Sequence, residues 1–173
     1  MMRVKFIYCL GIISVMAGCS SHIEEAKTME SYDNKQVEIP CKISKYGIEK
    51  EYHSNGKLKA EIGYNAKHQR HGATKVYYEN GNLESLFCYQ NGEPQGGKRY
   101  YESGALRMEV EFSNDNTKSF QKYYYENGNL KMERPLTKDG NKSWVINGIL
   151  KEYNENGELK TATQYIMGEK QVK

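Results

Sequence analysis

The stretch Tyr77-Tyr-Glu-Asn-Gly-Asn-Leu83 decides the fold, because the phrase Tyr-x-x-Asn/Ser-Gly-x-Leu occurs five times in 173 residues. The five copies are Tyr52–Leu58, Tyr77–Leu83, Tyr100–Leu106, Tyr124–Leu130 and Tyr153–Leu159. Their glycines lie 25, 23, 24 and 29 residues apart. A period of this length is typical of stacked supersecondary units, each too small to bury its own apolar face. We therefore expect one repeat domain over residues 46–173.

Each glycine is followed by about eight residues in which apolar and charged side chains alternate. In the first unit, Leu58, Ala60 and Ile62 alternate with charged residues. This pattern predicts a strand with one buried and one wet face, which antiparallel sheets permit. A second strand should end at the tyrosine, because Asn-Gly between two strands signals a hairpin. The sequence thus predicts an all-β fold, an extended antiparallel meander of about five repeated β-hairpins with no substantial helix after signal removal.

The loop length follows from the repeat, since a one-residue slip in register moves every side chain to the opposite face. A three-residue loop, Glu79 to Gly81, with a left-handed glycine would pair Tyr77 with Leu83. A two-residue loop would instead pair Leu83 with Tyr78. The residue four before the glycine is tyrosine in all five units, whereas the residue three before it varies. The three-residue loop is therefore favoured.

Residues 1–18 have the build of a secretory signal, with a basic start and an apolar run from Phe6 to Ala17. The run is shorter than the roughly 20 residues that a membrane-spanning helix needs. Its end, Met16-Ala-Gly-Cys19, resembles the lipobox of bacterial lipoproteins, in which the signal is cut before a cysteine that is then acylated. The resemblance implies lipidation at Cys19; an ordinary cleaved signal or an uncleaved start is the alternative. A lipidated protein would sit on a membrane without crossing it.

Residues 19–45 carry this cysteine and then a polar stretch of mixed charge, which is typical of a tether. About twenty flexible residues have an end-to-end distance on the order of 25 Å. In lipoproteins of this kind an aspartate after the cysteine often means retention in the inner membrane, and Ser20 stands here instead. The resemblance implies a cell-envelope protein, with the outer membrane favoured, facing the periplasm or the cell surface.

Charge and cysteine content restrict the partners. Without Arg3 and Lys5 of the signal, 23 basic residues face 22 acidic ones, a net charge of +1. This balance argues against nucleic acid, whose partners usually show a strong basic excess. An exported chain can keep a disulfide, but sequence cannot show whether the Cα atoms of Cys41 and Cys88 lie within about 7 Å. We expect two unpaired thiols in preference to a disulfide.

The repeated tyrosine, Asn-Gly, leucine and lysine pattern resembles the bacterial variant of the MORN repeat over roughly residues 46 to 168. The resemblance implies a sheet of hairpins with a binding or scaffolding role, no catalytic site and no cofactor. Several bacterial proteins of this type are described as antitoxins or immunity proteins, and some are lipoproteins. The fourth unit departs from the pattern at Arg134-Pro135. Because proline cannot donate to a ladder, we expect an edge, a bulge or a local break there.

No sequence motif supports catalysis or metal binding. A nucleophile elbow, a phosphate-binding glycine loop and a His-Glu-x-x-His helix are all missing from the sequence. His68 and His71 form the only close histidine pair, and they lack the further ligands that a zinc site needs. We expect them in a solvated loop, and we expect neither a metal site nor enzymatic activity.

A lysine stands six residues before each turn glycine, at Lys50, Lys75, Lys98, Lys122 and Lys151. By alternation these lysines share a face with the repeated tyrosines. In a structural interpretation, each aliphatic stem packs along the sheet while its ammonium reaches water near an acidic neighbour. In a binding interpretation, the row receives acidic side chains of a partner or lipid phosphates. The sequence leaves both interpretations open.

Additional tyrosines, Tyr78, Tyr101 and Tyr125, with Tyr123 nearby, occur only in the three middle units and are expected on the wetter face. Tyrosine is enriched at interfaces, although cross-strand packing would explain the same residues. The sequence thus predicts a non-catalytic envelope protein that binds a partner protein, most concretely as an immunity or antitoxin-like factor against a toxin. The alternative is an envelope structural or surface protein that binds lipid headgroups or polysaccharide through these lysines and tyrosines. Its oligomeric state is not predicted.

Overall fold

The computed structural model describes residues 41, 44 and 46–172. Twelve strands form one antiparallel sheet, and this part of the chain contains no helix, hence none that could cross a membrane. The strands are β1 (Ile48–Tyr52), β2 (Leu58–Tyr64), β3 (Arg70–Tyr77), β4 (Leu83–Gln90), β5 (Glu93–Tyr100), β6 (Leu106–Phe112), β7 (Lys118–Tyr124), β8 (Leu130–Lys138), β9 (Trp144–Ile146), β10 (Gly148–Tyr153), β11 (Leu159–Ile166) and β12 (Glu169–Lys170). The expected signal, Cys19 and nearly all of the expected tether lie outside the described residues.

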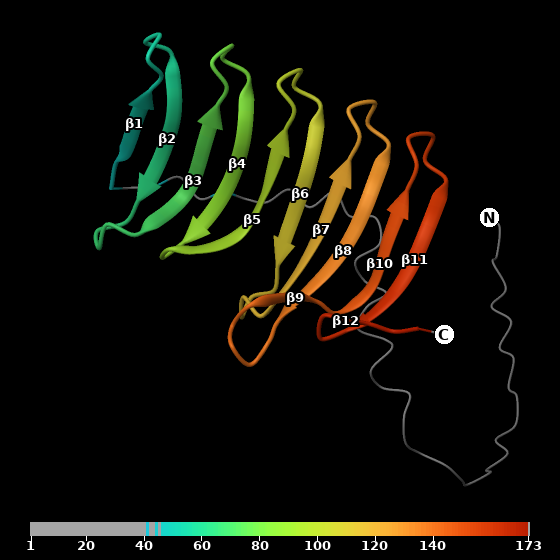
Figure 1. The fold of residues 1–173 in the computed structure, drawn as a ribbon. Coiled ribbons are helices and arrows are strands. Elements are labelled where there is room, and N and C mark those ends of the chain that lie inside the picture. Colours follow the sequence, from blue (N-terminus) through green and yellow to red (C-terminus); the bar gives the residue numbers. More distant parts are fainter. Residues whose placement is uncertain (1–40, 42–43, 45, 173) are drawn as a thin grey trace, which may run out of the picture. The chain divides into compact units, whose positions relative to one another are not determined.

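The strands follow chain order across the sheet from β1 to β8 and then through β10, β11 and β12, while β9 pairs with β8 beside this path. Five hairpins stand side by side. Their turns lie at one end of the strands, and the connections between units lie at the other end (Figure 1). The sheet belongs to a compact unit, Glu38–Lys173. The predicted all-β meander of five hairpins is confirmed, and two short strands, β9 and β12, add to it.

The hairpin turns have the predicted three-residue loop. In the second unit the Tyr78 amide donates to the Asn82 carbonyl and the Gly81 amide to the Tyr78 carbonyl, both over 2.9 Å. Gly81 has φ 97°, in the left-handed region that favours glycine. Tyr77 pairs with Leu83, and the equivalent tyrosine and leucine pair in the other four units. Loop length and turn register are therefore confirmed.

Beyond each tyrosine-leucine pair the register shifts by one residue. In the second unit Val76 pairs with Ser85, so Glu84 is left without a direct partner. The extra residue is charged in every unit, at Lys59, Glu84, Arg107, Lys131 and Lys160. In such a bulge two residues oppose one, so the alternation of side chains restarts behind it.

Because of the bulge, the predicted assignment of side chains to the two faces of the sheet was wrong behind each turn. Lys50 and Lys75 both lie directly opposite Glu61, so the repeated lysines and tyrosines share their side with this glutamate. Ala60 and Ile62, expected on that same side, point the other way. We call the side with the five lysines the lysine face. The opposite side, which carries Ala60, Ile62, Arg99, Val110 and Arg134, is the arginine face.

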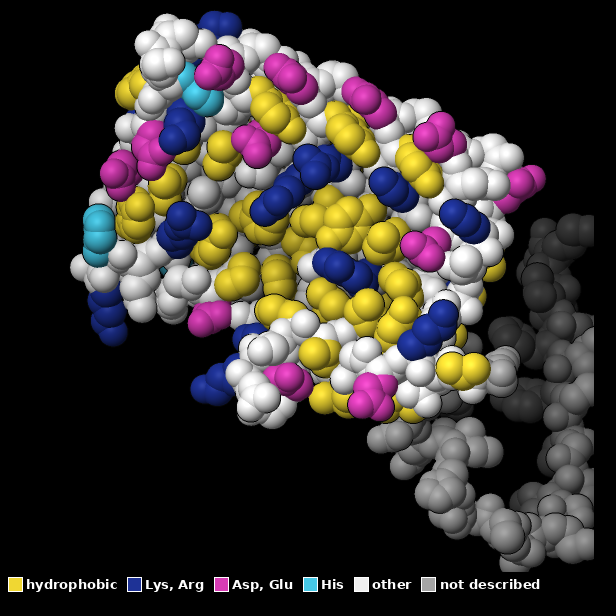
Figure 2. All heavy atoms as spheres, viewed as in Figure 1, with side chains coloured by type: hydrophobic (Ala, Val, Ile, Leu, Met, Phe, Trp, Pro, Cys, Tyr) yellow, Lys and Arg dark blue, Asp and Glu magenta, His cyan; other side chains and the backbone are white. Residues whose placement is uncertain are grey.

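Most of the deeply buried apolar side chains lie on the arginine face. Val110 is 2% exposed and lies opposite Gly97 and Gln121. A Cβ on Gly97 would come within 2.5 Å of the Phe87 ring, so this ring lies directly on the glycine. Figure 2 looks onto this face and shows apolar side chains gathered over the middle strands, with basic side chains among them. The described residues form no second layer over this sheet. The Phe87 ring, packed on the backbone of Gly97, therefore covers part of the face itself.

Cys41 and Cys88 form a disulfide with their Cα atoms 5.3 Å apart. The expectation of two unpaired thiols was wrong. No sequence motif near either cysteine indicates that the segment before β1 reaches β4, which carries Cys88. Ser44 in the same segment donates through Oγ to the Tyr64 carbonyl over 2.5 Å. The segment before β1 is therefore attached to β4 through the disulfide and to β2 through the Ser44 hydrogen bond.

The fourth unit accommodates proline by changing partners on one side. β8 pairs with β7 through Arg134 and Pro135 without interruption. On its other side, β10 pairs with β8 before the proline and β9 pairs with it afterwards. The Pro135 carbonyl accepts from the Asn147 amide over 3.2 Å. Since N and C=O of a strand residue point to the same side, the missing donor lies where the ladder changes. The predicted local break occurs on this side only.

Candidate binding faces

One row of the lysine face alternates lysine with glutamate across the sheet. From β1 to β10 its members are Lys50, Glu61, Lys75, Leu86, Lys98, Glu109, Lys122, Glu133 and Lys151. Leu86 takes the place of one acid. The row follows from the bulge, which brings the glutamate of each second strand beside the lysine of each first strand.

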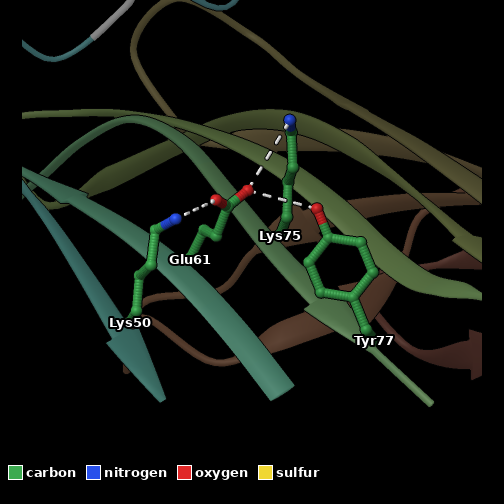
Figure 3. A network of polar contacts seen from close by, with 4 residues as sticks. All are labelled: Lys50, Glu61, Lys75 and Tyr77. Carbon is green, nitrogen blue, oxygen red and sulfur yellow. Dashed lines mark hydrogen bonds and ion pairs between the residues drawn. The ribbon is translucent and has the colours of Figure 1, made fainter. Parts of the chain in front are cut away.

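Glu61 shows how the row is held together (Figure 3). Its carboxylate lies 3.4 Å from Lys50 Nζ and 3.8 Å from Lys75 Nζ, and it accepts the Tyr77 hydroxyl over 3.1 Å. The arrangement recurs at Glu133, which pairs with Lys151 at 3.2 Å and accepts the Tyr153 hydroxyl over 2.9 Å. In three units the repeated tyrosine therefore bonds to the acid of the preceding unit.

The lysines of the row do not all have the same environment. Lys50, Lys75 and Lys151 each have a carboxylate within 4 Å, which supports the structural interpretation for these three. In the described part of the chain Lys98 and Lys122 have no such ion pair, and Lys122 lies over the Phe120 ring at 5.9 Å. Partly exposed pairs of this kind contribute only about 0–1 kcal/mol each, so the row orders the face more than it stabilises the sheet.

Three of the repeated tyrosines, each bonded to a glutamate, have raised pKa values. Burial and then the hydrogen bond to Glu133 raise the pKa of Tyr153 to about 12. Burial and the bond to Glu61 raise the pKa of Tyr77, and burial with the bond to Glu109 raises that of Tyr124. In each case ionisation would place a second negative charge beside a carboxylate.

This predicts an alkaline limit to stability. Because the folded pKa values exceed the ordinary value of about 10, the folded state keeps protons that the unfolded chain loses. The contribution is complete below pH 10, and the free energy of unfolding should fall as pH rises from about 10 to 12. Phenolate absorbance during titration should show a late-ionising group of tyrosines. Changing Tyr77, Tyr124 and Tyr153 to phenylalanine should reduce that group to Tyr64, whose pKa is also raised by burial and by Glu49, and uniform ionisation near pH 10 in the native protein would contradict the prediction.

The tyrosines expected to bind a partner join neighbouring units. Tyr78 donates through its hydroxyl to the Tyr100 carbonyl over 2.8 Å, Tyr101 to Tyr124 over 2.8 Å and Tyr125 to Tyr153 over 2.9 Å. In the first unit His53 Nε2 lies 2.8 Å from the Tyr77 carbonyl. Alternation puts them on the arginine face, the side with the buried apolar residues, rather than on the wetter face. Their rings remain partly exposed.

Tyr123, the fourth tyrosine of the predicted site, holds an arginine. Arg134 donates to Gln121 Oε1 from Nη2 over 2.6 Å and from Nε over 3.2 Å, and Nη2 lies 2.9 Å from the Tyr123 hydroxyl. That hydroxyl donates in turn to Gln121 Oε1 over 2.8 Å. The sequence indicated Arg134 only as a departure from the apolar pattern. In the structure it lies on the same face as the additional tyrosines.

Six cations of the arginine face lie over aromatic rings, namely Arg70 over Tyr89, Lys138 over Trp144 and four on the middle strands. For these four, the distances from cation to ring centroid are 5.7 Å for Arg99 over Phe87, 5.8 Å for Arg107 over Tyr101, 5.2 Å for Lys131 over Tyr125 and 5.4 Å for Arg134 over Tyr123. Sequence reasoning missed all six cations as site residues. Two of them, Arg107 and Lys131, occupy the bulge position, so a recurrent charge directly after the leucine was the available signal.

His68 lies exposed in the connection between β2 and β3, as expected, but His71 is the second residue of β3 and only partly exposed, so the expectation of a loop was wrong for it. His68 stacks on Tyr64 with ring centroids 4.5 Å apart, while His71 Nδ1 lies 3.4 Å from the Asn91 amide. Over residues 41, 44 and 46–172, no three side chains of the metal-binding types cluster together. The two histidines thus have separate contacts in the structure.

Comparison with known families gives five matches, one to each hairpin. The matched model is described as the MORN repeat variant, and it covers residues 45–66, 70–91, 97–114, 121–138 and 146–167. No curated protein matches the chain. Each segment contains one turn glycine, and together the segments span more than half of the sequence. The chain therefore belongs to the MORN repeat variant family.

Proposed function

We propose that this protein is a non-catalytic, lipid-anchored protein of the bacterial cell envelope that binds a partner protein. MORN repeats are commonly repeats that bind membranes or proteins. The observation that carries the proposal is the arginine face, where Arg99, Arg107, Lys131 and Arg134 lie over aromatic rings. Aromatic and arginine side chains are the types enriched at protein interfaces.

Anchoring through Cys19 is supported by the lipobox-like end of the signal. The Cys41–Cys88 disulfide agrees with export, because disulfides persist in oxidising compartments. Ser20 in place of aspartate favours the outer membrane. The tether would then hold the sheet on the order of 25 Å from the headgroups.

Membrane attachment is expected to depend on one sulfur. In a Gram-negative host, the native full chain should sediment with membranes and incorporate labelled palmitate. The Cys19→Ser variant should lose the label and remain in the inner membrane through an uncleaved signal or be released. Cys41→Ser is the matched control, because it removes a thiol without touching the lipobox, and it should still be labelled. Native protein without label, found in the soluble periplasm, would refute the anchor.

An immunity or antitoxin-like role is the most concrete form of partner binding. It is supported by the family resemblance, in which proteins of this type are described in such roles. A neighbouring gene that encodes a toxin would supply the partner. The purified protein should form a saturable complex of fixed stoichiometry with that toxin, and expression should protect cells from it. A complex without protection would leave binding but exclude immunity.

A second candidate function is adhesion of the lysine face to lipid headgroups or polysaccharide. It is favoured by Lys98 and Lys122, which have no carboxylate within 4 Å among the described residues. Cys19→Ser protein should then associate with vesicles of anionic lipid, and changing the five lysines of the row to glutamine should abolish the association. Equal binding by both proteins would exclude this function.

A further inference from the structure

The arginine face carries positive charge that the described chain does not neutralise. Ion pairs join Lys59 to Glu51 on this face and three lysines to glutamates on the other face. Within the described residues, none of the four cations stacked on the middle strands has a carboxylate within 4 Å. The guanidinium groups of Arg99 and Arg107 make no hydrogen bond there, and both residues are exposed. Among the described residues, Glu84 and Glu152 also lie on this face, but neither forms an ion pair with these four cations, which are therefore available to a negatively charged partner.

The way these cations are held leaves their donors available. A guanidinium that lies on an aromatic ring uses its flat face for the contact and directs its N–H groups outward. Arg134 is positioned further by Gln121 and Tyr123, which leave Nη1 without a partner among the described residues. Fixed guanidinium edges match carboxylates, which can accept two parallel hydrogen bonds. The geometry thus suits carboxylate side chains.

The floor between the arginines is apolar. Met108 lies opposite Arg99 in the pairing of β5 with β6, and Val110 lies two residues further along β6, opposite Gly97. Both are already buried by neighbouring side chains, with 8% and 2% exposed, and the apolar surface that stays partly exposed beside them belongs to Phe87 and Tyr123. Phosphodiester or sugar chains would gain little from such a floor, whereas an apolar side chain would bury area there. An apolar group between two acidic groups fits this arrangement best.

We propose that the arginine face binds an extended protein segment of the pattern acidic-x-apolar-x-acidic. This rests on the protein-binding function proposed above and names the chemistry of its partner. Arg99 on β5 and Arg134 on β8 are three strand spacings apart, roughly 14 Å, and are offset by two residues along the strands, so their Cα atoms lie about 16 Å apart. Residues i and i+4 of an extended segment are separated by about 13 Å, and the long arginine side chains span the remaining distance. The two acidic side chains therefore reach the two arginines while residue i+2 packs on the partly exposed Tyr123 ring of β7, which lies between them.

The probe is a fluorescein-labelled peptide with two tandem copies of Glu-Ser-Leu-Ser-Glu, added to the purified chain with Cys19→Ser. Fluorescence anisotropy should show saturable binding that weakens as salt is raised. Peptides with glutamine for glutamate, or with serine for leucine, should bind at least about tenfold more weakly, a loss of about 1.4 kcal/mol. An oligothymidine of equal charge should not compete. No saturable binding, or equal binding by any of these three controls, overturns the proposal.

Two double variants separate the faces. Arg99→Gln with Arg107→Gln removes two exposed cations without side-chain hydrogen bonds, so folding should be kept and peptide binding should fall about tenfold. Lys98→Gln with Lys122→Gln makes the same charge change on the lysine face, and it should alter binding less than about twofold. Equal losses in both variants would mean attraction by net charge alone and would refute a site.

The same variants distinguish this inference from the function on which it rests. If the Arg99→Gln, Arg107→Gln protein binds its toxin and protects cells like the native chain, the arginine face is not the docking surface, although the function stands. If the peptide binds through the arginines but no toxin is neutralised, the immunity role fails and the docking surface stands.

Discussion

Replacing Cys41 and Cys88 with serine is expected to lower the free energy of unfolding by about 4 kcal/mol. The bond closes a long loop, because the two cysteines are 47 residues apart in sequence. In the chain-entropy model, opening such a loop raises the entropy of the unfolded state by the equivalent of that free energy. The loop contains the first hairpin and most of the second. Urea unfolding of the two proteins at one pH would measure the loss.

Reduction provides the internal control for this prediction. A thiol reductant should lower the unfolding midpoint of the native protein to that of the double serine variant and leave the variant unchanged. Cys88 is 5% exposed, so reduction should require partial opening of the sheet and proceed slowly without denaturant. Two titratable thiols in oxidised, purified native protein would show that the bond does not form.

The second large effect is expected from Gly97→Ala, which should destabilise the fold by about 2–3 kcal/mol. A Cβ at Gly97 would lie 2.5 Å from two atoms of the Phe87 ring and 2.8 Å from the Leu86 carbonyl. The ring could rotate away, but the carbonyl belongs to the backbone of the neighbouring strand. The β4–β5 ladder must therefore shift. Phe87 also supports Arg99, so the variant should weaken peptide binding as well.

Gly140→Ala is the matched control. A Cβ there would have no neighbour within 4 Å, and the residue has no positive φ. The substitution should therefore be neutral or stabilise by up to about 1 kcal/mol, through the lower entropy of the unfolded chain. If Gly97→Ala and Gly140→Ala have equal unfolding free energies, the close packing of Phe87 on Gly97 is not a constraint.

The hairpins could be predicted from sequence because their turns depend on residues close together in the chain. An Asn-Gly or Ser-Gly pair requires a left-handed glycine, and a tyrosine four residues before it selects the loop length. The pairing of Tyr77 with Leu83 follows from these two facts. The faces of the side chains that follow the leucine could not be predicted from the alternation of apolar and charged residues. A single unpaired residue, such as Glu84, reverses it, and a bulge is visible only once the ladder is formed.

The candidate site was predictable only in part. The additional tyrosines were recognised by their absence from the end units, and three of them proved to bond to the next unit's backbone. The arginines were missed because Arg99 and Arg134 come to lie on one face only through the pairings of β5 to β8, which join residues that are distant in sequence. Side chains on adjacent strands combine into one surface only after register and bulges assign them to a face.

By itself, the sequence determined the repeat, its hairpin loops and the pairing at each turn, because turn geometry is set by contacts within seven residues. The tertiary structure alone decided which residues share a face and which strand the Cys41–Cys88 bond attaches to the first segment. It also decided that β9 replaces β10 as the partner of β8 after the proline of the fourth unit. Each of these depends on contacts between strands, and a one-residue change in register moves every following side chain to the other side.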